Sequence, residues 1–308
     1  MRSLPVPDVC RDVCIRIPLK RALAFSCMIN PFSGKEHIWE ITPAEKKKKI
    51  AVVGAGPVGL QAAWILAKRG HEVKVYEKEI TAGGQYRLAA VPAMKQELAK
   101  TISTYLTFCK KYGAEVIYGV KATKEMLEQE GFDEIILACG AQPLVPRIPG
   151  IDGENVYLAN QVLSFDVRLS GQKILVLGAG LVGAEAAEVL STYGNKVTVV
   201  DMLDKAAPLA PIRPRENLLS RLDKAGVGFY LNSRVCEIRP DGIRYEQNGE
   251  TKEMTGFDSI VLAFGSRSDK ALETEYEGDH RIHSVGDCLT AGDAKKGIYE
   301  ATKLAMVL

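Results

Sequence analysis

The sequence lacks the features that mark several large classes of protein. No apolar stretch approaches the roughly 18 residues needed to span a bilayer. The acidic and basic residues nearly cancel to a formal net charge of +2, and no basic face with interleaved aromatic side chains is present. These absences argue against a membrane and against nucleic acid as the main partner. The one basic run, Lys46 to Lys49, is expected to be a solvated linker.

Histidine is scarce, and cysteine does not form a paired framework. The chain has four histidines, none at metal-ligand or catalytic-triad spacing, so no catalytic acid or base is assigned. Its seven cysteines, an odd number, indicate thiols or metal ligands rather than disulfides. Residues 21–29 place a basic residue before a short apolar run, but no small-residue cleavage site follows, which argues against a signal peptide. We expect a cytoplasmic protein.

The sequence does contain one pattern written twice. The phrases IAVVGAGPVG and ILVLGAGLVG each carry three glycines at the same spacing, and an acid follows the third glycine by 18 residues in both copies. Near-identical phrases, FDEIILACG and FDSIVLAFG, end 86 and 87 residues after the first glycine. Such self-similarity marks an internal repeat. The corresponding residues are Gly54, Gly56, Gly59, Glu77 and Gly140 in the first copy and Gly178, Gly180, Gly183, Asp201 and Gly265 in the second.

Each copy predicts a dinucleotide site. A glycine-rich turn between a buried strand and a helix lets the backbone approach a pyrophosphate, and the helix N-terminus presents free N–H groups to it. Pro57, whose fixed φ suits the first helical position, supports a helix start directly after Gly56. Glu77, followed by Lys78, and Asp201 are placed to accept hydrogen bonds from ribose hydroxyls. Two copies therefore imply two nucleotides.

The order of the motifs predicts an α/β fold of two Rossmann-like domains, the second inserted into the first. A chain of 308 residues exceeds the size at which a single core usually keeps growing. After Gly265 only a short strand and a helix remain, which cannot form a domain and must complete one already begun. We expect a cysteine-bearing segment at 1–45, a first domain at 46–157 and 268–308, and an inserted domain at 158–267.

Local patterns predict the elements within these domains. Gly113 is placed to end a helix whose apolar residues include Cys109. Three prolines in PLVPRIPG predict an irregular crossover between domains at 143–150. The expected elements are strands at 50–53, 73–77 and 135–138, helices at 57–68 and from 98, a strand-rich stretch at 227–260, and a final strand at 281–285 and helix at 295–307.

The order of the motifs resembles that of flavoprotein reductases with two dinucleotide-binding domains. Here the first copy continues into Gly83-Gly84-Gln85, and the tail carries Gly286-Asp287. In that superfamily the first unit and the C-terminal Gly-Asp segment hold FAD, with the aspartate reaching the ribityl chain, and the inserted unit holds NAD(P)H. The resemblance implies that the first-copy residues bind FAD together with Gly84, Gln85, Gly286 and Asp287, and that the second-copy residues bind NADH.

A closer resemblance rests on CMINPFSGKE, residues 27–36, followed by ITPAEKKKKIAVVGAGP and LAAVPAMKQELAK. These phrases resemble the C-terminal half of the 2,4-dienoyl-CoA reductase and 2-enoate reductase family, relatives of trimethylamine dehydrogenase, over nearly the whole chain. In that family hydride passes from NADH to FAD. Electrons then pass through a [4Fe-4S] cluster to FMN in a TIM barrel, where an activated alkene is reduced.

Two departures limit what this resemblance implies. The N-terminal barrel is missing, so the chain alone is not expected to reduce alkenes. It is expected to be half of a split enzyme with a separately encoded FMN barrel or other redox partner protein, a truncated gene product, or a free-standing reductase. The family binds its cluster with four cysteines, whereas this chain has three at the corresponding positions, Cys10, Cys14 and Cys27. Pro7 occupies the position of the first cysteine. Three thiolates can hold a cluster only if another ligand, such as the nearby Asp8, binds the fourth iron. Two interpretations therefore stay open: a labile cluster, and three thiols that bind no cluster.

The remaining cysteines argue against a disulfide-reductase relay. Such enzymes place a CxxxxC just beyond the first Gly-Gly or a CxxC in the second unit, and neither is present. Cys109 lies on an apolar helical stripe and is expected in the core. Cys139 and Cys288 each stand alone in the sequence, which favours small buried side chains over redox partners.

The sequence thus predicts an FAD-dependent NADH oxidoreductase module that passes electrons to an iron–sulfur or flavin partner. Asp201 and Asp204 give a negative strand end that would repel a 2′-phosphate, which favours NADH over NADPH despite Lys205. Two other hypotheses stay open: a nucleotide-binding remnant without turnover, and an independent NADH oxidase or ferredoxin-type reductase that uses no cluster.

Overall fold

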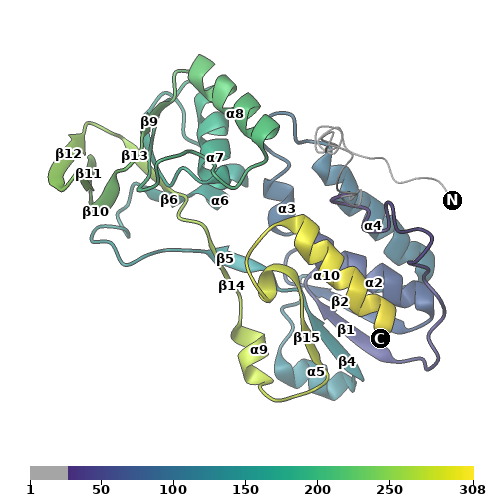
Figure 1. The fold of residues 1–308 in the computed structure, drawn as a ribbon. Helices are drawn as coiled ribbons and strands as arrows, with labels where there is room; N and C mark the ends of the chain where they lie inside the picture. Colours follow the sequence, from purple (N-terminus) through teal and green to yellow (C-terminus); the bar gives the residue numbers. More distant parts are fainter. Residues whose placement is uncertain (1–26) are drawn as a thin grey trace. The chain divides into compact units, whose positions relative to one another are not determined.

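The computed structural model describes residues 27–308 and divides them into two compact units. The first unit contains residues 27–90, 96–142 and 267–308, and the second contains 91–95 and 143–266. The second unit is therefore inserted into the first, which confirms the predicted topology (Figure 1). Two short strands, β5 (Ala141–Pro143) and β14 (Ser266–Ser268), lead the chain out of the first unit and back, and they pair with each other.

The first unit is built on a five-stranded parallel sheet in the order β15-β4-β1-β2-β3. The four residues of β1 that follow Lys49 are all buried, as in strands that are covered on both faces. The strands of this sheet are β1 (Lys49–Val53), β2 (Glu72–Glu77), β3 (Glu115–Tyr118), β4 (Glu134–Leu137) and β15 (Ile282–Ser284).

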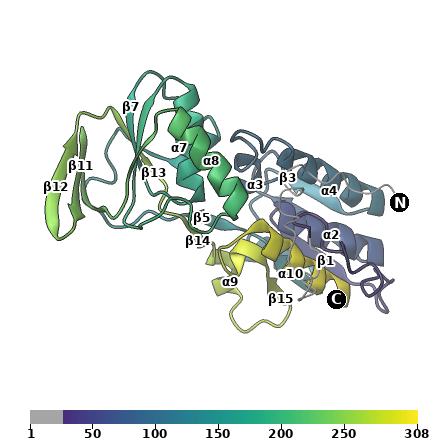
Figure 2. The same cartoon turned by 45° about the horizontal axis from the view of Figure 1, so that its top comes forward.

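Helices cover this sheet from two sides (Figure 2). Helices α2, α4 and α10 pack into one core cluster with Val52, and α5 and α9 contribute to a second cluster with Val53, the next residue along β1 and therefore on the opposite face. The helices of the unit are α2 (Pro57–Arg69), α3 (Gln85–Leu88), α4 (Leu98–Tyr112), α5 (Lys124–Glu130), α9 (Ala271–Glu275), the 3₁₀ turn η1 (Gly286–Cys288) and α10 (Ala294–Val307).

Helix ends follow the capping chemistry of the sequence. Helix α2 begins at Pro57 and ends at Gly70, whose φ of 101° is the left-handed conformation that glycine adopts without strain. Helix α4 ends at Gly113 as predicted, and the Gly113 N–H donates to the Cys109 carbonyl at 2.9 Å. The Asp293 side chain caps α10 by accepting from the Lys296 N–H at 2.8 Å.

The second unit combines a parallel sheet with an antiparallel one. Its parallel sheet has the order β6-β13-β7-β8-β9, and the antiparallel sheet has the order β10-β11-β12. Apolar side chains of the antiparallel sheet, such as Ile243 and Tyr245, pack with Leu175 and Leu177 of β7. The elements are β6 (Val156–Leu158), α6 (Ala159–Leu163), β7 (Lys173–Leu177), α7 (Leu181–Thr192), β8 (Lys196–Val200), α8 (Ile212–Lys224), β9 (Gly228–Tyr230), β10 (Arg234–Arg239), β11 (Gly242–Gln247), β12 (Glu250–Thr255) and β13 (Ser259–Leu262).

The boundary between the units differs from the expected one. Residues 143–157 were assigned to the first domain, whereas the structure places them in the second. Strand β6 pairs with β13, with Val156 opposite Ile260, and Ile148 and Ile151 pack against the core of the second unit. The irregular connector has no periodicity that could show on which core it packs. Residues 91–95 also belong to the second unit, and no sequence pattern indicated this.

The described part of the N-terminal segment lies on the first unit. Tyr105 of α4 donates its hydroxyl to the Ile29 carbonyl at 2.6 Å, and Phe32 and Ile41 pack against the core that contains α2. The ring of Phe32 also lies 6.3 Å from that of Trp64. Residues 27–41 therefore cover part of the first unit rather than forming a domain.

Candidate nucleotide-binding sites

The first glycine turn connects β1 to α2 with very little space around its backbone. Gly54 has a φ of 106°, and its N–H donates to the Tyr76 carbonyl at 2.8 Å. A Cβ on Gly54 would overlap the Ala138 carbonyl, and one on Gly59 would overlap the Gly54 carbonyl. These two glycines are thus required by close approach of the chain to itself.

Gly56 is different, because nothing of the protein fills the space beside it. Its φ of −70° is open to any residue, and a Cβ built there meets no atom within 4 Å. Gly56 is the N-cap of α2, and no side chain caps the helix. The turn therefore presents a free helix N-terminus beside a space that a Cβ would partly fill, which is the arrangement that a pyrophosphate requires.

Glu77, the last residue of β2, is hydrogen-bonded to the first glycine turn. Its side chain is only 5% exposed, Oε2 accepts from the Ala55 N–H at 2.8 Å, and Oε1 accepts from the Glu79 N–H at 3.0 Å. A carboxylate offers about four lone-pair sites, so both oxygens keep capacity for a ribose hydroxyl. Lys78, the next residue, is exposed.

The structure brings the other first-unit candidates to this turn. The Gly83 N–H donates to the Ala55 carbonyl at 2.8 Å, and a Cβ on Gly84 would lie 3.9 Å from the Gly56 Cα. A Cβ on Gly286 would lie 3.0 Å from the side chain of Val58. The segments carrying Gly84 and Gly286, about 200 residues apart in the sequence, thus meet at the start of α2.

Two further candidates are held by hydrogen bonds in the first unit. Gln85 donates through Nε2 to the Ala141 carbonyl, directly after Gly140. Asp287 accepts from the Gly292 N–H at 3.0 Å, and burial raises the pKa of this carboxyl although that hydrogen bond opposes the rise.

The second glycine turn repeats the first in detail. Gly178 has a φ of 112° and donates to the Val200 carbonyl at 2.8 Å, and a Cβ on Gly183 would overlap the Gly178 carbonyl. Gly180, the uncapped N-cap of α7, has a φ of −61° and no atom within 4 Å of a built Cβ. Gly265 has a φ of 98° after β13.

Asp201 occupies in the second unit the place that Glu77 has in the first. Its Oδ2 accepts from the Ala179 N–H, and its Oδ1 accepts from the Leu203 N–H at 2.8 Å. In both turns, then, an acid at the carboxyl end of the second strand accepts a hydrogen bond from the N–H of the residue after the first glycine. The repeat in the sequence therefore corresponds to the same backbone-to-carboxylate hydrogen bond in each unit.

Two buried carboxylates on α7 were missed by the sequence analysis. Glu185, two residues after Gly183, is 5% exposed and is paired with Lys95, and Glu188 is paired with Arg221. Burial raises the pKa of Glu185 although Lys95 opposes the rise. The signal available was two acids within the otherwise apolar phrase GAEAAEVL. The pairing of Glu185 with Lys95 belongs to the second unit, where residues 91–95 lie.

Two of the cysteines proposed for a cluster lie outside the described residues, and the expectation for two other cysteines was wrong. Cys10 and Cys14 lie outside 27–308, and within that range no group of three or more cysteine, histidine or acidic side chains is arranged to hold a metal ion. Cys109 is buried as expected, and burial raises the pKa of its thiol to about 12. Cys139 and Cys288 are not isolated, because their thiols are hydrogen-bonded to each other. This contact was not predicted because the two residues are far apart in the sequence.

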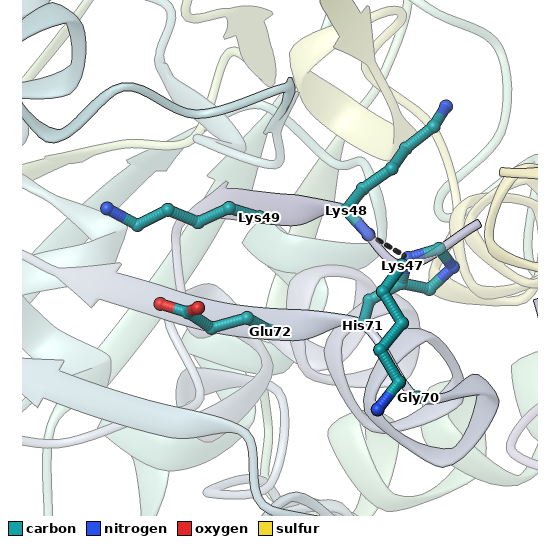
Figure 3. A pocket seen from close by; sticks show the side chains of 6 residues that line it. All are labelled: Lys47, Lys48, Lys49, Gly70, His71 and Glu72. Carbon is teal, nitrogen blue, oxygen red and sulfur yellow. Dashed lines mark hydrogen bonds between the residues drawn. The ribbon is translucent and has the colours of Figure 1, made fainter.

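A pocket of about 400 Å³ lies away from the glycine turns (Figure 3). It opens at the amino ends of β1 and β2, between Lys47 and Glu72, whereas the turns follow the carboxyl ends of their strands. His71 in this pocket is buried and accepts through Nδ1 from the Lys48 N–H at 3.2 Å. Ligands of open α/β sheets bind at the carboxyl ends, so this pocket is not the nucleotide site.

Comparison with known proteins identifies the class. Residues 48–298 match the family model of the pyridine nucleotide-disulphide oxidoreductases, and the chain belongs to that family. It is thus an FAD-dependent pyridine nucleotide oxidoreductase by class.

Individual relatives agree with the resemblance seen in the sequence. The chain is 34% identical to the bilirubin reductase of Mediterraneibacter gnavus, over 92% of this chain and 44% of that protein. It is 33% identical to the NADH oxidase of Thermoanaerobacter brockii, over 92% of this chain and 46% of that protein. The structure of a 2-naphthoyl-CoA reductase complex superposes with a TM-score of 0.86 at 29% identity, covering 92% of this chain and 43% of that one.

The chain spans about half the length of the relatives that it matches. In residues 27–308 we find no helix that is both long and apolar enough to cross a bilayer.

Proposed function

We propose that the first unit binds FAD, that the second binds NADH, and that the chain transfers hydride from NADH to FAD. The observation that supports this most is the pair of glycine turns in which Gly56 and Gly180 leave open the space beside an uncapped helix N-terminus. When bound, FAD supplies the ring system that accepts a hydride. The protein's own residues bind and orient the two nucleotides, and we assign no acid–base step to them.

Only the first unit has the additional segments expected of a flavin site. Gly84 lies against Gly56, and the turn with Gly286 and Asp287 reaches the start of α2. The resemblance to two-domain flavoprotein reductases implies that Asp287 contacts the ribityl chain. Its fixed backbone partner, the Gly292 N–H, supports this role because the hydrogen bond orients one oxygen and leaves the other available.

For the second unit we propose NADH rather than NADPH. The Asp201 carboxylate is fixed by the Ala179 and Leu203 N–H groups at the end of β8. A carboxylate there can accept from a 2′-hydroxyl and repels a 2′-phosphate. Asp204 adds a second negative side chain to the same loop.

We further propose that a separate redox partner receives the electrons. Relatives that match this chain over less than half of their length are named reductases of bilirubin and of cinnamate. The acceptor of this chain's electrons would then bind outside the segment that the chain shares with them. A [4Fe-4S] cluster on Cys10, Cys14 and Cys27 is the path that the family resemblance implies, and iron and sulfide analysis of anaerobic protein tests it. Activity without an added partner, as the name NADH oxidase of one relative suggests, is the alternative.

Two matched variants test the assignment of the nucleotides. Gly56→Ala and Gly180→Ala are both compatible with the backbone and meet no protein atom, so both variants are expected to fold. Gly56→Ala should weaken FAD binding and leave NADH binding unchanged, and Gly180→Ala should do the reverse. A change of at least about tenfold in Kd, or about 1.4 kcal/mol, is expected in each case.

Calorimetric titration of each variant with each nucleotide gives the result. If Gly56→Ala weakened NADH instead, the assignment of the two units would be reversed. If neither variant changed either Kd, the glycine turns would not be the binding sites.

A further inference from the structure

Two cysteines from distant parts of the sequence meet in the first unit. Cys139 follows β4 and Cys288 follows β15, and these strands pair in parallel with Ser284 opposite Leu137. The Val285 N–H continues the pairing by donating to the Leu137 carbonyl at 3.0 Å. The two segments therefore leave the sheet at the same edge, and Asp269 joins them, because its N–H donates to the Gly140 carbonyl at 3.1 Å and its carbonyl accepts from the Cys288 thiol. Both belong to the apolar cluster that contains Leu137.

The contacts of the two thiols form a chain of hydrogen bonds. The Cys139 thiol is hydrogen-bonded to Cys288, and the Cys139 N–H also donates to the Cys288 sulfur. The Cys288 thiol donates to the Asp269 carbonyl at 3.3 Å. Cys288 is fully buried, whereas Cys139 is half-buried and is the thiol that a small solute reaches first.

We propose that Cys139 and Cys288 form an oxidisable dithiol, a modification site at which hydrogen peroxide closes an intramolecular disulfide. Disulfide formation requires two sulfurs in contact, and sulfurs that share a hydrogen bond are already neighbours. Cys139 is the more accessible thiol, so peroxide meets it first. Its hydrogen bond to Cys288 raises its own pKa and lowers the pKa of Cys288, which favours Cys288 as the nucleophile that attacks a sulfenic acid on Cys139. The charges nearest Cys288 oppose each other, since Lys270 lowers and Glu273 raises the pKa of its thiol.

The reaction balances with peroxide as the only oxidant. The Cys139 sulfur attacks one oxygen of the peroxide while its thiol proton passes to the other oxygen, so that the O–O bond breaks, Cys139 becomes a sulfenic acid and one water leaves. The Cys288 sulfur then loses its proton and attacks the Cys139 sulfur. The S–S bond forms, the S–OH bond breaks, and the hydroxide takes up the proton as a second water. Two thiols are oxidised and one peroxide is reduced to two waters.

The disulfide would join the loop that carries Gly140 to the turn that carries Asp287. Closing a long loop removes freedom from the unfolded chain, so the oxidised protein should unfold at a higher denaturant concentration than the reduced one. Dithiothreitol should reverse the shift. This consequence needs no bound flavin and therefore stands apart from the proposed function.

Peptide mapping of the full chain tests the proposal. The protein is treated with hydrogen peroxide, remaining thiols are alkylated, and trypsin is added without reductant. Cleavage at Lys124, Arg147, Arg281 and Lys295 gives peptides 125–147 and 282–295, which carry the two cysteines. We expect these peptides to appear joined, with the loss of two hydrogens, and to separate on reduction.

Three variants control the experiment. Cys139→Ser and Cys288→Ser should each abolish the joined peptides and the denaturant shift. Cys236→Ser should change neither, because Cys236 is a half-buried thiol in the other unit whose sulfur contacts the Arg234 carbonyl. Circular dichroism establishes that each variant is folded. Recovery of the two wild-type peptides separately, each alkylated or each oxidised to a sulfinic acid, would overturn the proposal, whether or not the protein binds FAD.

Discussion

Replacing Glu77 by glutamine tests whether the acid of the first unit holds the nucleotide turn. In the native protein this buried carboxylate accepts two backbone hydrogen bonds, from the Ala55 N–H at 2.8 Å and the Glu79 N–H at 3.0 Å. Glutamine can accept only one of them, and its amide N–H₂ faces the other donor. A hydrogen bond to a charged group contributes about 1.5–3 kcal/mol, so we expect the free energy of unfolding to fall by about 2–3 kcal/mol.

The effect on cofactor binding should be confined to one unit. If the displaced Ala55 N–H costs the flavin site about 1.4 kcal/mol, the Kd for FAD rises about tenfold. The matched control is Asp201→Asn, which disturbs the corresponding hydrogen bonds from Ala179 and Leu203 in the second unit. It should weaken NADH and leave FAD unchanged.

The assays are urea unfolding followed by circular dichroism and titration of each variant with FAD and NADH. The reasoning is refuted if Glu77→Gln has the wild-type unfolding midpoint and the wild-type Kd for FAD. It is equally refuted if the two variants affect the same nucleotide.

Three further predictions concern charges. Lys95→Met leaves the Glu185 carboxylate buried without its cation, and it should lower the free energy of unfolding by about 3 kcal/mol in urea. Burial raises the pKa of Glu185 in the folded protein. The loss should therefore grow as the pH rises above about 4.5 and the carboxyl group becomes charged. Burial lowers the pKa of His71, so its neutral form stabilises the fold above about pH 6.5 and this contribution is lost as the pH falls; His71→Gln should flatten the dependence of Tm on pH in that range. Arg281 holds the pKa of Asp279 at about 2, and Arg281→Ala should raise it toward 3.8, as NMR titration of the carboxyl carbon would measure.

The sequence predicted the parts of the fold that depend on local chemistry. The glycine turns, the start of α2 at Pro57 and the end of α4 at Gly113 each follow from one residue's backbone preference. The insertion of the second unit was predicted from the number of elements after Gly265, because one strand and one helix are too few to form a domain and could only complete an earlier sheet. Strand β15 indeed joins β4 in the first sheet.

The features that the sequence did not predict depend on tertiary contacts. Residues 143–157 pack on the second unit through Ile148 and Ile151, and an irregular segment carries no pattern that selects one core over another. The contact between Cys139 and Cys288 depends on β15 lying beside β4, which no local pattern specifies. The pairing of Glu185 with Lys95 has the same origin, since 90 residues separate them.

The central claim, transfer of hydride from NADH to FAD, is tested most directly by anaerobic titration of the FAD-reconstituted protein. NADH is added stepwise while the visible absorbance of the flavin is followed, and NADPH is titrated in parallel. The account predicts that the flavin bleaches with one NADH per FAD, that NADPH is less effective, and that Gly180→Ala retains FAD but requires more NADH. A protein that binds FAD and stays oxidised in excess NADH would contradict it.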